Sequence, residues 1–413
     1  MRGAWRRRSV RPELRSGIAR PARASLVVVL DLLIAACGGG SPMTAPGPTV
    51  TFTSLSVGSG TGCAVATGGP AYCWGSNAVG QLGNGSFTST STPVAVAGGL
   101  TFTALSVSNG GGSTCGLATG GAAYCWGNDD AGQLGNGATT NSATPVAVTG
   151  GQTFSAVSAG ETFACGLTAA GAAYCWGENS AGNLGTGTTT SSSAPVAVAG
   201  GLAFQQLSGG TTYSFACGVT TLGAAYCWGW NMLGQLGTGS TTGPAVCNGY
   251  ACSTTPVAVA GGYTFRAVSA GGAFACGVTT GGVAYCWGWN DLGQLGDSAT
   301  TTSATPVAVA GGHSFSAVTA GGAFACGLTA AGAAYCWGAN SLGELGDSTQ
   351  TNRIVPVAVA GGHSFATLVA GNLSVCGLTT TGVAYCWGNN TAGELGNGTL
   401  QLSTVPTKMA NQP

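Results

Sequence analysis

Short apolar segments, separated by glycine and small polar residues, recur along most of the chain. In one stretch they are FSAVSA at 154–159, TFACGLT at 162–168, AAYCW at 172–176 and PVAV at 195–198. Alternating apolar positions, β-branched and aromatic residues, and Gly, Ser or Thr between the segments all favour strands. No segment keeps the period of a helix. The pattern therefore predicts four short strands in this stretch.

The same pattern recurs in seven units. Each unit contains the tripeptide CWG, then a glycine that opens G-[QEN]-L-G, then a proline that usually belongs to PVAV. The glycine-to-proline gap is 13 residues, except in the fourth unit, where it is 22. Four strands per unit, repeated in register, are typical of a propeller. We expect an all-β, seven-bladed β-propeller over 51–413, with 404–410 beside 51–57 to close the ring.

Each unit also carries two cysteines ten residues apart. In CGLTAAGAAYC (165–175) the register of a tight hairpin places Cys165 opposite Cys175, with Gly171 at the left-handed position of the loop. Such a pair lies about 4.5 Å apart between Cα atoms, within reach of a disulfide. Reduced core cysteines or metal ligands are the alternatives. The predicted pairs are Cys63–Cys73, Cys115–Cys125, Cys165–Cys175, Cys217–Cys227, Cys276–Cys286, Cys326–Cys336 and Cys376–Cys386.

The unit resembles the RCC1 (regulator of chromosome condensation) repeat. The resemblance rests on CWGSNAVGQLGNG at 73–85 with PVAV at 93–96, and on the six further copies. It implies a seven-bladed propeller. Family functions include nucleotide exchange on a small GTPase, scaffolding, and inhibition of other proteins by secreted members. No segment matches the exchange loops residue by residue, and the paired cysteines differ from cytosolic members and suit an exported branch.

Charge is distributed very unevenly along the chain. Eight of the 11 Lys and Arg residues lie in the first 23 positions, and after residue 37 three basic residues face nine acids, a balance of 3 − 9 = −6. A nucleic-acid binder needs a basic face, so we expect no nucleic-acid partner. The basic start precedes ASLVVVLDLLIAAC at 24–37, which has the form of a secretion signal.

Ile34-Ala35-Ala36-Cys37 resembles a bacterial lipobox, in which the cysteine is lipidated. We therefore expect a signal peptide of the lipoprotein type at 1–36 and a flexible tether at 37–50. The expected location is the cell envelope, by a lipid anchor on Cys37 and by no other contact with the membrane. An ordinary signal peptide, with free secretion, is the alternative.

The sequence contains little that would support catalysis. The two histidines, His313 and His363, occupy the same place in GGHSF of adjacent units and lack neighbouring acids. Asp297, Asp347, Glu344 and Glu394 stand where other units have polar loop residues. We therefore expect no catalytic residue, no metal and no cofactor. A hydrolase of surface polysaccharide or peptide and an exchange factor remain the alternatives.

The fourth unit breaks the pattern. Its nine extra residues contain Cys247 and Cys252, which predict an eighth disulfide that displays Tyr250. After CWG, only units four and five have tryptophan, and apolar residues follow the first of these. Exposed aromatic residues on a rigid scaffold are common anchors for partners; packing of the longer loop against them is the alternative. We expect a monomeric, non-enzymatic module that binds a protein or glycan through Trp230, Met232, Leu233, Tyr250 and Trp289.

Overall fold

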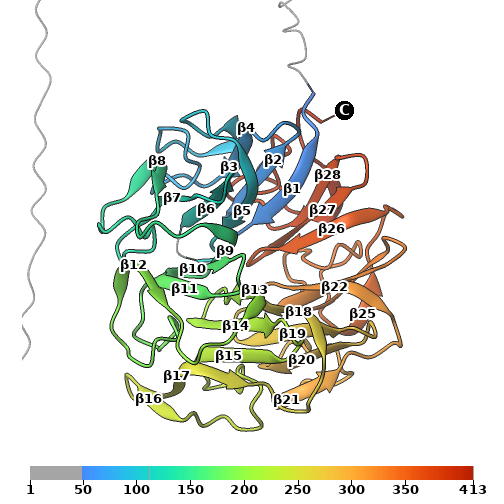
Figure 1. The fold of residues 1–413 in the computed structure, drawn as a ribbon. Helices are drawn as coiled ribbons and strands as arrows, with labels where there is room; N and C mark the ends of the chain where they lie inside the picture. Colours follow the sequence, from blue (N-terminus) through green and yellow to red (C-terminus); the bar gives the residue numbers. More distant parts are fainter. Residues whose placement is uncertain (1–48, 111, 413) are drawn as a thin grey trace, which may run out of the picture. The chain divides into compact units, whose positions relative to one another are not determined.

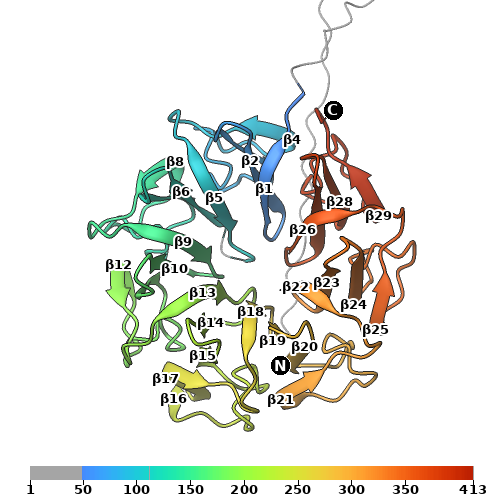
Figure 2. The ribbon, with the colours of Figure 1, turned by 45° about the vertical axis from the view of Figure 1, so that its right-hand side comes forward.

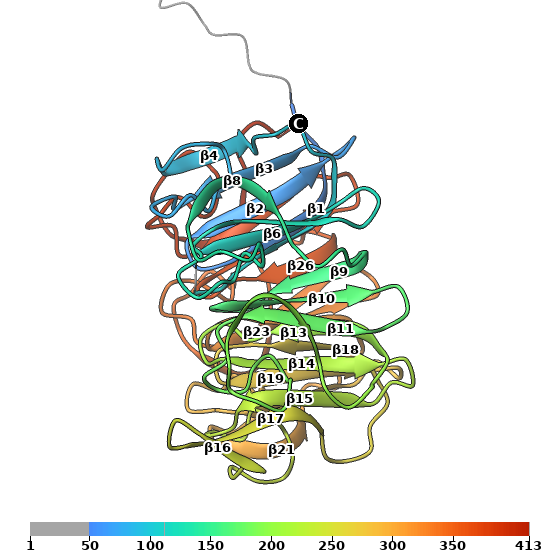
Figure 3. The ribbon, with the colours of Figure 1, turned by 60° about the vertical axis from the view of Figure 1, so that its left-hand side comes forward.

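The computed structural model describes residues 49–110 and 112–412, in which every regular element is a β-strand. Seven sheets surround a central channel, so the predicted seven-bladed propeller is confirmed (Figures 1 and 2). Each blade is one uninterrupted stretch of chain; the strands pair in sequence order in six blades, and in the fourth β17 pairs with β15 and carries β16 outside it. Figure 3 shows the sheets from the side. Six blades have four strands, and the fourth blade has a fifth, β16, at its outer edge.

The strands succeed one another along the chain, blade after blade. Blades one to three comprise β1 (Phe52–Val57), β2 (Thr61–Ala66), β3 (Ala71–Gly75), β4 (Thr90–Ala95); β5 (Phe102–Val107), β6 (Ser113–Ala118), β7 (Ala123–Gly127), β8 (Ser142–Ala147); and β9 (Phe154–Ala159), β10 (Phe163–Thr168), β11 (Ala173–Gly177), β12 (Ser192–Ala197). Blade four comprises β13 (Phe204–Gly209), β14 (Phe215–Thr220), β15 (Ala225–Trp230), β16 (Ala245–Cys247), β17 (Tyr250–Ala258). Blades five to seven comprise β18 (Phe265–Ala270), β19 (Phe274–Thr279), β20 (Ala284–Gly288), β21 (Ser303–Ala308); β22 (Phe315–Ala320), β23 (Phe324–Thr329), β24 (Ala334–Gly338), β25 (Arg353–Ala358); and β26 (Phe365–Ala370), β27 (Ser374–Thr379), β28 (Ala384–Gly388), β29 (Ser403–Lys408).

The cysteine hairpins have the expected register. Cys165 pairs with Cys175, and Gly171 has a φ of 83° in the three-residue loop between the strands. All seven pairs are disulfides with Cα–Cα distances of 4.0–4.1 Å, slightly shorter than expected. Directly opposed residues without hydrogen bonds between them already lie close, and a disulfide joins them there. The eighth disulfide, Cys247–Cys252, is also present.

The hydrophobic core lies between adjacent blades. Trp176 is fully buried, and it packs with Phe154 of its own blade against the Cys115–Cys125 disulfide and Leu134 of the preceding blade. The Trp176 indole Nε1 donates a hydrogen bond of 3.0 Å to the Gln133 carbonyl. The tryptophan of CWG makes this bond in all seven blades. The motif therefore joins neighbouring blades through one buried polar contact and one apolar cluster.

The last glycine of G-x-L-G accommodates this tryptophan. Gly83 has a φ of 66°, and a Cβ atom there would lie 2.7 Å from Nε1 of Trp126. Both the left-handed backbone and the close approach of the ring require glycine.

The first strand of each blade lines the channel. In six blades its fifth residue is a Ser or Thr, whose hydroxyl oxygen accepts a hydrogen bond of 2.8–3.0 Å from a backbone N–H in the first strand of the next blade. These six residues are Ser56, Ser106, Ser158, Ser208, Ser269 and Thr319. The seventh blade has Val369 at this position and lacks the hydroxyl.

The ring closes where blade seven meets blade one. Met409, which follows β29, packs in one cluster with Phe52 and Trp74 of the first blade. The Val50 N–H donates to the Asn411 carbonyl over 3.0 Å, and Gln412 Oε1 accepts from the Ala384 N–H over 2.8 Å. The C-terminal segment thus lies beside the first unit, as the repeat pattern predicted.

Two faces of the propeller differ in their connections. We call the face with the first-to-second and third-to-fourth strand loops the long-loop face. The other, the hairpin face, has the cysteine hairpins and the connections between blades. Among the described residues no helix is long and apolar enough to cross a membrane.

Candidate functional site

The fourth blade differs from the others on the long-loop face. Its loop between β13 and β14 has five residues (210–214), as does the matching loop of the second blade (108–112), whereas the other five blades have three. This extension contains Tyr213, which is 37% exposed. The Tyr213 N–H donates to the Gly272 carbonyl of the fifth blade over 3.2 Å, so the longer loop is held against its neighbour.

The insertion before the last strand of this blade forms the β16–β17 hairpin. Its turn is Asn248-Gly249, with φ angles of 49° and 84°, the left-handed pair that a two-residue hairpin turn requires. The Cys247–Cys252 disulfide crosses the hairpin. The turn and the disulfide together fix Tyr250, which opens β17 and is 46% exposed.

Three aromatic side chains meet at this blade. The Trp230 ring lies between Tyr213 and Tyr250, with centroid distances of 5.6 and 5.4 Å. Trp230 Nε1 is buried and has no hydrogen-bond partner in the structure. The longer loops therefore do pack on Trp230, and the tyrosines that cover it still present surface to solvent.

A hollow of about 270 Å³ lies beside this cluster. Tyr213 and Trp289 line it, together with Asn372 and Leu373 of the seventh blade. Tyr213 thus belongs both to the cluster and to the hollow, and connects Trp230 with Trp289. We call the four side chains Tyr213, Trp230, Tyr250 and Trp289 the aromatic patch.

The other predicted binding residues stand as follows. Met232 is 42% exposed, and Leu233 is half-buried with its N–H donating to Gln235 Oε1 over 2.9 Å. Their role in binding stays a prediction, as do those of Trp230, Tyr250 and Trp289. Cys37 lies outside the described residues.

Sequence reasoning missed Tyr213 and Leu373. The spacing held a partial signal for Tyr213: the unit's phenylalanine and first cysteine are 13 residues apart in the fourth unit (Phe204 and Cys217) and also in the second (Phe102 and Cys115), against 11 in the other five. Leu373 reaches the hollow because loops of four successive blades line it, from Tyr213 in blade four to Leu373 in blade seven, and spacing along the chain does not reveal this.

Two acids lie beside the fourth blade. Glu161 precedes β10, and Glu178 follows β11 in the same blade. A Cβ atom on Gly110 would lie 3.0 Å from Glu161 Cγ and 3.1 Å from the Thr211 carbonyl, so the Glu161 side chain is close to the extended loop. Burial, and then the charge of Glu178, raise the pKa of Glu161 to about 7.

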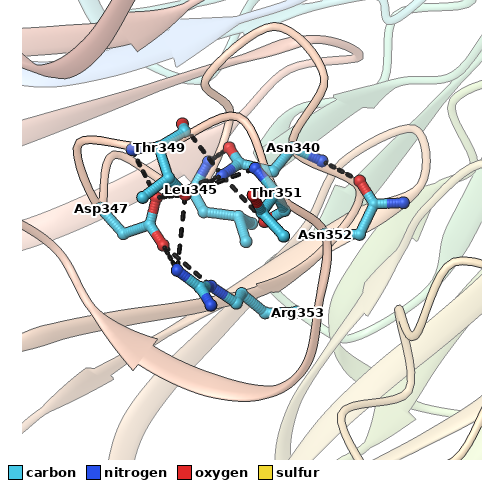
Figure 4. Close-up of polar contacts among 7 residues, drawn as sticks. All are labelled: Asn340, Leu345, Asp347, Thr349, Thr351, Asn352 and Arg353. Atoms are coloured by element: carbon cyan, nitrogen blue, oxygen red, sulfur yellow. Dashed lines mark hydrogen bonds and ion pairs between the residues drawn. The ribbon is translucent and has the colours of Figure 1, made fainter.

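The acids considered as candidates for hydrolysis form hydrogen bonds and ion pairs within their own loops. Asn340 accepts a bond from the Leu345 N–H over 2.9 Å, and its amide donates to Asp347 over 3.1 Å (Figure 4). Asp347 in turn pairs with Arg353 over 2.8 Å. Burial opposes ionisation of Asp347, but hydrogen bonds from Thr349 and Arg353 hold its pKa below the usual range. An acid so held is poorly suited to donate a proton.

The other acids considered for catalysis also accept hydrogen bonds within their loops, and the two histidines stack on tyrosines. Asp297 accepts from Asn290 over 3.1 Å, and the buried Glu344 and Glu394 accept from N–H groups of their own loops over 2.8 and 2.9 Å. His313 and His363 lie on the hairpin face, stacked on tyrosines with centroid distances of 4.0 and 4.1 Å. The histidines and the acids are therefore on opposite faces. In the part of the chain that the structure describes, no three His, Cys, Asp or Glu residues could hold a metal ion together.

Comparison with protein families gives one consistent match. A family model described as "Regulator of chromosome condensation (RCC1) repeat" matches residues 69–117, 120–167, 170–217, 223–278, 281–328 and 381–413. A second model with the same description matches 154–183, 265–294, 315–344 and 365–394.

Solved structures show the same fold. Yeast RCC1 (Prp20) in a complex with Kap60 is 19% identical, with 82% of this chain and 83% of that chain covered and a TM-score of 0.72. Prp20p from Saccharomyces cerevisiae, described with its binding properties to Gsp1p and histones, is 18% identical, with 88% and 86% covered and a TM-score of 0.72. The ectodomain of the Arabidopsis thaliana receptor kinase ACR4 is 24% identical, with 82% and 96% covered and a TM-score of 0.50.

Proposed function

Because this chain belongs to the RCC1 repeat family, we propose that it is a non-enzymatic scaffold whose partner protein docks on the aromatic patch. The family generally serves as a binding or exchange-factor module. The similar yeast propeller is described with protein partners, namely Kap60, Gsp1p and histones. Those partners do not identify the partner of this chain, so we infer the binding site from the residues of the aromatic patch.

The observation that carries the proposal is the union of three irregularities in one place. The extended loop supplies Tyr213, the inserted hairpin supplies Tyr250, and the position after CWG supplies Trp230 and Trp289. The second blade has an equally long loop, but it contains no aromatic residue, and no blade other than the fourth and fifth has a tryptophan after CWG. Partly exposed aromatic side chains next to a hollow, on a rigid support, have the composition of binding hot spots.

The support is rigid for two reasons. Every blade is crosslinked within its central hairpin, and neighbouring blades share buried tryptophans. A partner therefore meets a surface that is already ordered, which lowers the entropic cost of binding.

We also propose that the chain works outside the cytosol. Eight disulfides fit an oxidising compartment. Together with the signal-like start at 1–36 and the lipobox cysteine Cys37, they favour export and anchoring at the cell envelope.

The test compares the wild type with the double variant Trp230→Ala/Trp289→Ala. Immobilised protein is used to capture proteins from envelope extracts, identified by mass spectrometry, and is applied in parallel to a glycan array. Leu222→Ala is the matched control, because Leu222 is 89% exposed on the hairpin face of the same blade. Thermal unfolding with disulfides intact verifies that both variants fold.

We expect proteins that bind the wild type and Leu222→Ala but not the double variant. Equal capture by all three would refute the patch. Binding of glycans alone, lost in the double variant, would replace the protein partner by a sugar.

A further inference from the structure

Charge is segregated between the two faces of the propeller. All nine acidic residues of the described chain lie in loops of the long-loop face. They come from blades two, three, five, six and seven: Asp129, Asp130, Glu161, Glu178, Asp291, Asp297, Glu344, Asp347 and Glu394.

The basic residues do not balance this face. Arg266 is the second residue of β18, and Lys408 is the last residue of β29, so both lie toward the hairpin face. Arg266 donates hydrogen bonds there to the Thr280 and Ser316 carbonyls. Arg353 does lie on the long-loop face, where Asp347 neutralises it. The long-loop face of the described chain therefore has an excess of acids, of which Asp130, Glu161, Glu178, Asp291 and Asp297 are exposed or half-buried and not paired with a basic side chain.

The aromatic patch lies within this acidic face and is flanked by carboxylates on both sides. Glu161 and Glu178 are on the side of blade three, and Asp291 follows Trp289 by two residues on the side of blade five. Glu161 and Glu178 are half-buried, and neither pairs with a basic residue of the described chain. Two like charges left together are unfavourable, and a cation between them relieves this.

We propose that the partner docks through a segment rich in lysine and arginine, with one cation at Glu161 and Glu178 and the adjacent chain over the aromatic patch. This rests on the proposed function and specifies the chemistry of the partner. The carboxylates attract the cationic group, while the rings of Tyr213 and Trp289 accept aliphatic stems and offer their faces to further cations. An anionic glycan or nucleic acid is repelled by the same face.

Synthetic peptides of equal length test this directly. One series is rich in Lys and Arg, one in Asp and Glu, and one is neutral; each carries a fluorophore, and binding to the full chain is measured by fluorescence anisotropy. We expect the basic peptides to bind at least about tenfold more tightly than the others. Added salt should weaken this binding, because the charges are at the surface.

The substitutions Glu161→Gln and Glu178→Gln keep size and remove charge. Each should weaken binding of the basic peptides several-fold, and together about tenfold or more. Asp130→Asn is the matched control, since it removes one exposed acid of the same face in blade two. Binding should also tighten as the pH rises through about 7, where Glu161 ionises beside Glu178, the charged group that acts on it.

The outcomes separate this inference from the proposed function. If basic peptides show no preference, or if Asp130→Asn weakens binding as much as Glu161→Gln, the inference is wrong, even where Trp230→Ala/Trp289→Ala still abolishes binding of some partner. If binding of the basic peptides depends on the two glutamates but not on the tryptophans, the proposal that the partner docks on the aromatic patch is wrong, and the proposal of an acidic site remains.

Discussion

Trp74 in the first blade donates a hydrogen bond from Nε1 to the main-chain carbonyl of Glu394 in the seventh, over 2.8 Å and across 320 residues of chain. The same bond joins neighbouring blades elsewhere over shorter separations, for example Trp176 with Gln133. The junction of the two chain ends is thus built like any other junction. Closure of the ring depends on packing and on hydrogen bonds between the blades, because no strand passes from one end of the chain into the sheet of the other.

Replacing this tryptophan tests whether closure matters in solution. Trp74→Phe removes the indole N–H and leaves the buried Glu394 carbonyl unpaired, which should lower the free energy of unfolding by roughly 1–3 kcal/mol. Urea unfolding measures it, with Trp176→Phe as the internal control. Loss at Trp176 without loss at Trp74 would mean that the ring is open at its ends.

Substitution of Asp129 should raise the free energy of unfolding, in contrast to substitution of Trp74. It stands where the other blades have a buried asparagine such as Asn340. The Leu134 N–H donates to Oδ1 over 2.9 Å, but Oδ2 is buried without a hydrogen-bond partner. We expect Asp129→Asn to stabilise the protein at neutral pH by about 1–3 kcal/mol, since the amide can donate as Asn340 does.

The pH dependence of Asp129 follows from its burial, which raises its pKa above the ordinary 3.8. Between 3.8 and the raised pKa the folded chain holds a proton that the unfolded chain releases. Its contribution to the free energy of unfolding therefore falls as pH rises through that window. Asp129→Asn should remove this decline; an unchanged difference between variant and wild type at all pH values would contradict it.

The interrupted row of channel hydroxyls predicts a stabilising substitution. Val369→Thr has nearly the same shape and restores the oxygen that Thr319 provides in the preceding blade, where it accepts from the Ala370 N–H over 3.0 Å. The equivalent donor is the N–H of Val57. We expect a gain of about 0.5–1.5 kcal/mol, measured by the urea midpoint at constant m-value. Val369→Ala, which adds no hydroxyl, should not stabilise.

Removal of a blade disulfide should lower stability, whereas removal of the Cys247–Cys252 disulfide should weaken partner binding. Serine at both Cys165 and Cys175 should lower the free energy of unfolding by about 2–3 kcal/mol, because a crosslink restricts the unfolded chain. Serine at Cys247 and Cys252 should leave the blades intact and weaken partner binding, since that disulfide fixes the Tyr250 hairpin. Mass spectrometry of unreduced peptides checks all eight pairs, and free thiols at most positions would contradict them.

The proposed lipid anchor is tested by Cys37→Ser. If Cys37 is the lipidated residue, the wild type fractionates with membranes and the variant is released into the soluble fraction. Metabolic labelling with a fatty-acid analogue should mark the wild type alone. Membrane association that survives the substitution would argue against the lipobox.

Regular spacing made the fold predictable. A motif that recurs seven times reveals both the number of blades and the register of each hairpin, and Gly171 even identified the loop type. The site was partly predictable, since Trp230, Trp289 and Tyr250 stand out as exceptions to the repeat. Tyr213 was missed because its two-residue extension leaves the spacing of the two cysteines unchanged, and Leu373 because its place beside the hollow depends on how the loops of successive blades are arranged.

The exposed acids, taken one by one along the sequence, look like interchangeable loop residues. Their common side of the propeller follows only from strand direction: the loops between first and second strands and between third and fourth strands lie at the same face in every blade. The role of the channel hydroxyls could not be predicted from the sequence either. A serine at the fifth position of a first strand has a hydrogen-bond donor only in the next blade, as Ser106 has in the Ala159 N–H.

Each blade is one continuous piece of chain, and Val50 lies within hydrogen-bonding distance of Asn411. The position of the chain ends is therefore arbitrary with respect to the fold. A circular permutant that joins these ends and opens a blade-to-blade connection, such as 310–314, keeps every sheet and every disulfide whole. The same property lets a single unit, like the fourth, acquire insertions while the other six units preserve the ring.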